Sequence, residues 1–193
     1  VLAAIMLVNL KRAYDHEIDT ARQTTENLTR VLEEHARQSL YRVDFLLSQV
    51  AEDLGNEQDF VSQDAAKLRS IMQALVPSDG LITGIGLIDA RGKLLAATST
   101  ADVTGAPSLA DRDYFVALQQ PTNSGVVLGA VINNSVTDKL TAPVGKRIQG
   151  PDGSFKGAIV ASMDPAYFQS FYASIRTEKS GFVTLFSRSG WIL

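Results

Sequence analysis

The chain contains no cysteine and only two histidines. Without cysteine it can form neither a disulfide nor a thiolate zinc site, and it lacks a thiol nucleophile. The two histidines, His16 and His35, stand nineteen residues apart in the N-terminal quarter. A histidine-based metal cluster or catalytic triad therefore cannot be assembled in the remainder of the chain. We expect no catalytic activity in this region and predict no cofactor and no metal site.

An excess of positive charge is also missing. The chain has 18 basic and 21 acidic side chains, a net charge of −3, and no short window is dense in lysine and arginine. This charge balance excludes the electrostatic footprint of a nucleic-acid-binding protein. The pair Gly84-x-Gly86 precedes the continuation of a strand pattern and not a helix, so it is not a phosphate-binding loop.

Proline and glycine are absent from residues 10–54. Apolar or small side chains recur there at a mean spacing close to the helical period of about 3.6 residues. The spacing predicts one long helix over residues 11–56, closed by Gly55-Asn56. Its first half is polar around a narrow apolar stripe, a pattern typical of a helix that contacts only a partner helix. We therefore expect a parallel homodimer through this helix.

Residues 1–10 are almost wholly apolar and run directly into Lys11 and Arg12. Such a boundary is typical of the end of a transmembrane helix. The run is too short to cross a bilayer, which takes about 20 residues. We interpret it as the last part of a membrane span, which anchors the protein in the inner membrane with the rest of this region outside the cytoplasm. A buried helix start or a signal-peptide remnant would look similar.

The pattern changes after residues 77–80, where glycine and β-branched residues become frequent and the period falls from 3.6 to 2. A short helix, with Ser62 as a possible cap, precedes this change and ends at Pro77. Strands are predicted at 82–89, 93–98, 125–133, 139–149 and 155–164, with helices at about 111–119 and 165–176. Consecutive hairpins favour an antiparallel sheet flanked by helices, so the fold class is α+β.

Four stretches in this order resemble the Cache family of extracytoplasmic sensor domains, whose fold is PAS-like. They are Gly86-Leu-Ile-Asp89 with Gly92-Lys-Leu-Leu95, Asp111-Arg-Asp-Tyr-Phe115, Gly153-Ser-Phe-Lys-Gly157 and Ser162-Met-Asp-Pro-Ala-Tyr-Phe168. The resemblance implies a five-stranded PAS-like sheet in a distal sensor module over residues 57–176. Residues 177–193 resemble the start of a second, proximal module of the double-Cache type.

The resemblance also implies a ligand site between the sheet and the short helix. Arg112 and Tyr114 match the family segment that holds the ligand, and a guanidinium can bind a carboxylate through two hydrogen bonds. Asp113 adjoins them, Asp164 ends the last strand, and Asn133, with Asn134 and Thr137, follows the third strand. Arg112 could instead pair with a neighbouring aspartate, and Asp164 could cap a helix.

The sequence departs from the amino-acid-sensing pattern, because Pro107 stands where that pattern has a tyrosine and Tyr114-Phe115 replace a Trp-Tyr pair. We therefore expect a small carboxylate or an amine as ligand. The function predicted is ligand sensing for a bacterial transmembrane receptor, in the first place a sensor histidine kinase, with a diguanylate cyclase or a chemoreceptor as alternatives. Two alternative functions belong to other classes of protein. The chain could be a structural dimerisation module without a ligand, or a cytosolic PAS module.

Overall fold

The computed structural model describes residues 2–57, 64–100, 102–123, 125–134, 137–175 and 183–186. It divides into two units, residues 1–39 and residues 40–193. Helix α1, Leu2–Asn56, is continuous and ends where the sequence predicts. No helix in the described ranges carries an apolar stretch long enough to span a bilayer. The predicted start of a second module over 177–193 falls outside the described residues except for 183–186.

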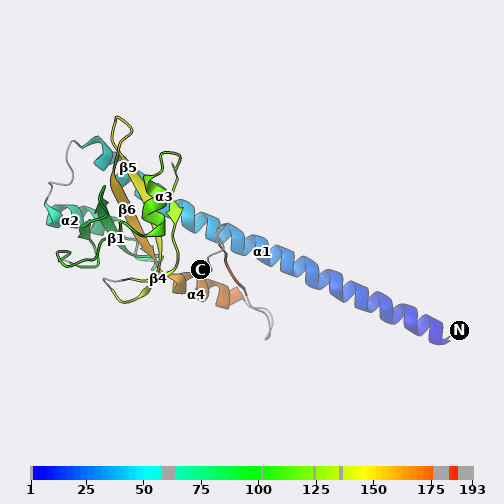
Figure 1. Ribbon diagram of the computed structural model, residues 1–193. Helices are drawn as coiled ribbons and strands as arrows, with labels where there is room; N and C mark the ends of the chain where they lie inside the picture. Colours follow the sequence, from blue (N-terminus) through cyan, green and yellow to red (C-terminus); the bar gives the residue numbers. More distant parts are fainter. Residues whose placement is uncertain are drawn as a thin grey trace. The chain divides into compact units, whose positions relative to one another are not determined.

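The fold of the second unit is α+β, as predicted (Figure 1). Its elements follow the predicted order, with the short helix α3 between the second and third strands. The helices after α1 are α2 (Ala65–Leu75), α3 (Asp113–Gln119) and α4 (Pro165–Ile175), and the strands are β1 (Ile82–Asp89), β2 (Leu94–Ala97), β3 (Val127–Leu128), β4 (Ile132–Asn133), β5 (Leu140–Gln149) and β6 (Phe155–Met163). Asp64 caps α2 by accepting a hydrogen bond from Ala66 N. The predicted cap Ser62 lies outside the described residues.

The strands form one antiparallel sheet in the order β2-β1-β6-β5-β3, and β4 also pairs with β5. The pairing of β6 with both β1 and β5 places the last strand in the middle of the sheet. Strands at such a position are covered on both faces and are therefore apolar nearly throughout. This explains why Ala158, Ile159 and Ala161 in β6 are fully buried.

The predicted strand 125–133 is divided into β3 and β4. Gly129 lies so close to α3 that a Cβ there would stand 2.8 Å from the Tyr114 ring. The backbone N–H of Ala130 donates to the Asp113 carboxylate at 2.9 Å. Gly129 N still donates to the carbonyl of Pro143 in β5 at 2.9 Å. The ladder is interrupted at the next residue, because the start of α3 takes up the N–H of Ala130.

The register assigns the side chains of the central strands to two faces. Lys146, Ile159 and Leu87 are cross-strand partners and share one face. The C-terminal part of α1 packs on this face, because Lys146 pairs with Asp44 at 2.8 Å and Lys156 donates to the carbonyls of Gly55 and Glu57. Gly145, Val160 and Gly86 are partners on the opposite face.

Gly55 allows the end of α1 to approach β5 closely. A Cβ at this position would stand 2.4 Å from the carbonyl oxygen of Gln149, a backbone atom that cannot turn away. Gly55 is the penultimate residue of the helix, which ends at Asn56 as the sequence predicts. The structure adds a second role for it, the close approach to the sheet.

We expect Gly55→Ala to lower the free energy of unfolding by about 1–3 kcal/mol, because the added methyl group forces the helix from the sheet. This loss should occur although alanine favours helix more than glycine does. Urea unfolding measures it. The control is Gly105→Ala, where no atom lies within 4 Å of the added Cβ, and which should change stability by less than about 1 kcal/mol. Unchanged stability in Gly55→Ala would contradict the close packing.

Candidate functional site

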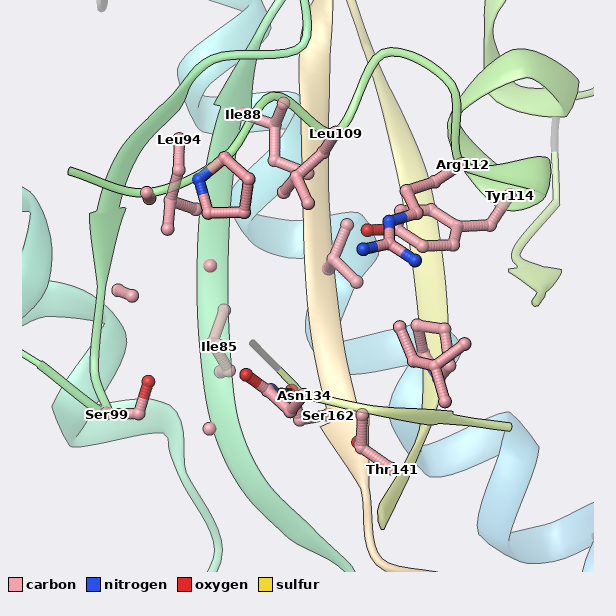
Figure 2. A pocket seen from close by; sticks show the side chains of 18 residues that line it. Ile85, Ile88, Leu94, Ser99, Leu109, Arg112, Tyr114, Asn134, Thr141 and Ser162 are labelled. Atoms are coloured by element: carbon pink, nitrogen blue, oxygen red, sulfur yellow. Dashed lines mark hydrogen bonds between the residues drawn. The ribbon is translucent and has the colours of Figure 1, made fainter. Parts of the chain in front are cut away.

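A pocket of about 80 Å³ lies on the face of the sheet opposite α1. Its floor is the sheet itself, and the segment before α3 closes it from above (Figure 2). The middle of the pocket is apolar. Its lining residues are Gly84, Ile85, Gly86, Ile88, Leu94, Ala97, Ser99, Ala106, Pro107, Leu109, Arg112, Tyr114, Ile132, Asn134, Thr141, Pro143, Val160 and Ser162.

Two glycines of β1, Gly84 and Gly86, make room for the pocket. Both lie on the pocket face, and a Cβ on Gly86 would stand 3.2 Å from a methyl group of Leu94. Side chains at these two positions would fill the space above the sheet. The Gly-x-Gly pair noted in the sequence therefore forms the floor of a cavity and not a loop.

Arg112 extends into the pocket from the residue that precedes α3 (Figure 2). The ion pairs found in the described part of the chain join other residues, and no aspartate or glutamate there pairs with this guanidinium. Its Nε is buried without a hydrogen-bond partner in the same described residues. A guanidinium that is partly desolvated and lacks a carboxylate is suited to bind an anion.

Tyr114 lies beside Arg112, and its ring is 4% exposed. Burial raises the pKa of its phenol to about 12, although the positive charge of Arg112 acts in the opposite direction. The phenol is therefore neutral at physiological pH and can donate its proton in a hydrogen bond. Arg112 and Tyr114 thus present a cation and a neutral donor to the same space.

Arg147 holds the helix that carries these two residues. From β5 its guanidinium donates to the carbonyls of Leu118 and Gln119 at 3.1 and 3.0 Å, where α3 ends. It also donates to the carbonyl of Gly153 at 3.0 Å and lies over the Phe155 ring at 5.0 Å. The positive charge at a helix C-terminus is favourable, and these bonds satisfy carbonyls that the helix leaves free.

The other three predicted site residues have local partners and do not line the pocket. Asp113 accepts from the backbone N–H groups of Tyr114 and Ala130 at 2.7 and 2.9 Å. Asp164 accepts from Ala166 N at 2.8 Å at the start of α4, the capping role that the sequence left open. Asn133 donates to Asp138 at 2.6 Å. The structure therefore brings together Arg112 and Tyr114 but not these three.

Ser162 is a pocket residue that the sequence analysis did not identify, whereas Asn134, which it named beside Asn133, does line the pocket. Ser162 lies in β6, where a single serine in an apolar strand gives no signal of a site. Asn134 follows β4 and donates to Ser162 Oγ at 3.3 Å. The alternation of side chains along β6 could have indicated that Ser162 shares a face with Val160, but the depth of the pocket depends on tertiary packing.

No aspartate, glutamate or histidine lines the pocket within the described residues, and no group of acidic or histidine side chains there could hold a metal ion.

The raised pKa of Tyr114 predicts how stability changes in alkali. The unfolded chain loses this phenol proton near the ordinary pKa of about 10, whereas the folded chain keeps it to about 12. The contribution of this neutral phenol to the free energy of unfolding is complete below pH 10. It is lost above that pH, at up to about 1.4 kcal/mol per pH unit. Urea unfolding between pH 9 and 11.5 should show a shallower decline in Tyr114→Phe than in the wild type.

The matched control for this measurement is Tyr41→Phe, since Tyr41 is 70% exposed. Its decline with pH should follow that of the wild type. Tyr172, whose pKa burial also raises, remains in both variants and contributes equally. Equal slopes in Tyr114→Phe and Tyr41→Phe would show that the Tyr114 phenol is accessible to water.

Comparison with known proteins gives matches at the level of structure. No family model matches the sequence, and no curated protein matches it significantly. The fold is similar to the extracellular domain of rpHK1S-Z16, described as a histidine kinase, with a TM-score of 0.68 and 24% identity. That alignment covers 82% of this chain and 64% of the other, so the chain spans slightly less than two thirds of that domain.

Two further sensor domains have the same fold. The ligand-binding domain of the Campylobacter jejuni chemoreceptor Tlp3, in complex with L-valine, gives a TM-score of 0.65 at 14% identity, over 86% of this chain and 67% of the other. The sensor domain of the Vibrio cholerae histidine kinase DctB gives 0.60 at 13% identity, over 82% and 60%. The Cache-type, PAS-like fold expected from the sequence is thus confirmed, and the chain has the fold of the extracellular sensor domains of histidine kinases and chemoreceptors.

Proposed function

We propose that this chain is the extracytoplasmic ligand-receiving domain of a bacterial membrane receptor. The observation that carries the proposal is Arg112, a guanidinium that points into the pocket without a carboxylate partner among the described residues. Leaving such a group unpaired is costly unless a ligand satisfies it. Signal reception accounts for this arrangement better than catalysis does, because the lining offers neither a nucleophile–base pair nor a metal site.

The ligand we propose is a small carboxylate. The planar fork of Arg112 can hold both carboxylate oxygens, and the neutral Tyr114 hydroxyl can donate to one of them. A cavity of about 150 Å³ takes a benzene molecule, so one of about 80 Å³ suits a ligand of only a few carbon atoms. An amine is the weaker candidate, because no acidic side chain among the described lining residues could balance an ammonium charge.

The ligands of similar structures support a carboxylate. The Tlp3 domain was determined with L-valine and the PctC domain of Pseudomonas aeruginosa with GABA. Both molecules carry a carboxylate as well as an ammonium group. The described lining residues offer a charged partner for the carboxylate, Arg112, and no charged partner for the ammonium group. We therefore limit the proposed ligand contacts from the sequence prediction to Arg112 and Tyr114, and leave out Asp113, Asp164 and Asn133.

The receptor that we propose is a sensor histidine kinase, because two of the similar domains described above belong to proteins named as histidine kinases. A diguanylate cyclase or a chemoreceptor would use the same kind of sensor. The apolar residues 1–10, followed by Lys11 and Arg12, support a membrane anchor at this end of α1. In this proposal residues 40–193 lie in the periplasm and α1 transmits the signal, as a shift of about 1–2 Å.

Dimerisation through the first part of α1 belongs to the same proposal. Leu10, Tyr14 and Ile18 are 67%, 66% and 50% exposed and follow each other at helical spacing. Large apolar side chains in such a row are typical of the seam between two helices. A homodimer would cover them, and it would give the helix a partner against which to shift.

Substitution of Arg112 tests ligand binding. We expect at least one small monocarboxylate to raise the melting temperature of the wild type. At 100 times its dissociation constant a ligand adds about 2.7 kcal/mol to the folded state, which corresponds to roughly 5–10 °C in a domain of this size. Arg112→Met should abolish the shift and leave the ligand-free melting temperature nearly unchanged, since the guanidinium has no ion-pair partner to lose among the described residues.

The control variant is Arg91→Met, in the exposed turn between β1 and β2, which should retain the full shift. The opposite pattern would contradict the proposal. If Arg112→Met lowers the ligand-free stability by more than about 1 kcal/mol and spares the shift, Arg112 is part of the scaffold.

Sedimentation of paired variants tests the dimer. Ile18→Glu introduces a charge into the proposed seam and should weaken dimerisation at least tenfold. His16→Glu introduces the same charge about 200° away around the helix and should leave it unchanged. A monomeric wild type, or equal effects of the two substitutions, would contradict dimerisation through this face.

A further inference from the structure

The pocket has a second polar region that the proposed carboxylate contacts do not use. It consists of Ser162 on β6 and Asn134 after β4, which lie close together and apart from Arg112 and Tyr114 (Figure 2). Apolar side chains, among them Ile132 and Val160, line the pocket around it. A ligand that reaches both regions needs a polar group at each.

The hydrogen bonds of this region fix the role of Ser162. The Asn134 side-chain oxygen accepts from Thr137 N at 3.3 Å, so its amide nitrogen faces Ser162 and donates to Oγ at 3.3 Å. Ser162 Oγ is therefore an acceptor toward Asn134 and keeps its own hydrogen for another partner. No acceptor for that hydrogen is found within the described residues.

The neighbouring strands leave this hydroxyl uncovered. The cross-strand partners of Ser162 are Gly84 on β1 and Pro143 on β5. Glycine has no side chain and proline has only an apolar ring, so neither can accept a hydrogen bond through its side chain. The hydroxyl of Ser162 is thus directed to the contents of the pocket.

We propose that Ser162 and Asn134 form a subsite for an uncharged oxygen of the ligand, a hydroxyl or an oxo group. The inference rests on the proposed function, in which Arg112 binds the carboxylate of the same molecule. It names the ligand class as small hydroxy or oxo monocarboxylates. An ammonium group brings donors only, and no carboxylate of the described lining residues compensates its charge.

A series of acids that share the propionate skeleton tests this subsite in the wild type. The ligands are propionate, L-lactate, pyruvate, 3-hydroxypropionate, L-alanine and β-alanine, and titration calorimetry measures each dissociation constant. At least one hydroxy or oxo acid should bind tenfold or more tightly than propionate, and both amino acids should bind more weakly than that acid. Equal affinities of propionate and all its oxygenated analogues, or tightest binding of an amino acid, would overturn the inference.

Ser162→Ala should remove the preference and leave propionate binding within about threefold, because the variant loses only the hydroxyl. The matched control is Ser170→Ala on the exposed face of α4, which should retain the preference. A preference that survives Ser162→Ala would also overturn the inference. If Ser162→Ala fails to fold, the dissociation constants of the wild type for the series of acids still decide whether the subsite exists.

The same data separate this inference from the proposed function. If acids bind and Arg112→Met abolishes their binding, but no oxygenated acid is preferred, only the subsite is wrong. If none of the acids binds and a wider screen of carboxylates also finds no ligand, the proposed function fails and the subsite fails with it.

Discussion

The pairing of β6 with β1 and β5 is the constraint on which the rest of this unit depends. Because successive side chains of a strand point to opposite faces, β6 contributes to two environments at once. Ile159 and Ala161 lie on the face that packs against α1, and Val160 and Ser162 lie in the pocket. A change in the position of β6 at the pocket would therefore be felt on the α1 face, which offers a physical route for the proposed signal.

The pocket contains hydrogen-bond donors that have no partner in the described part of the fold. The scaffold residues around it bind other parts of the fold: Arg147 binds the end of α3, and Asp113 binds the segment after β3. Arg147 Nε is nevertheless buried without a hydrogen-bond partner among the described residues. Within the cavity, Arg112 and Ser162 retain donors that no described protein group takes up. Unmet polar groups of this kind reduce stability, and the presence of two of them in one cavity is the reason we assign it to a ligand.

The sequence predicted the long helix and the positions of β1, β5 and β6 well, because hydrophobic periodicity is a local property. It could not predict the division of the third strand, which follows from the hydrogen bond of Ala130 N to Asp113 at the start of α3. Arg112 and Tyr114 were predicted as ligand contacts through the family resemblance, and the structure places both in the pocket. Asp164 illustrates the limit: an aspartate before proline suits a ligand site and a helix cap equally, and only the bond to Ala166 N distinguishes them. Nothing in the sequence around Ser162 indicated that its side chain lines a pocket.

The account is tested most directly by a crystal structure of the protein with a small acid bound. It predicts that both carboxylate oxygens lie within hydrogen-bond distance of the Arg112 guanidinium, with the Tyr114 hydroxyl on one of them and the remainder of the ligand directed toward Ser162. A structure in which Arg112 pairs with a protein carboxylate, while the acid binds elsewhere or not at all, would contradict it.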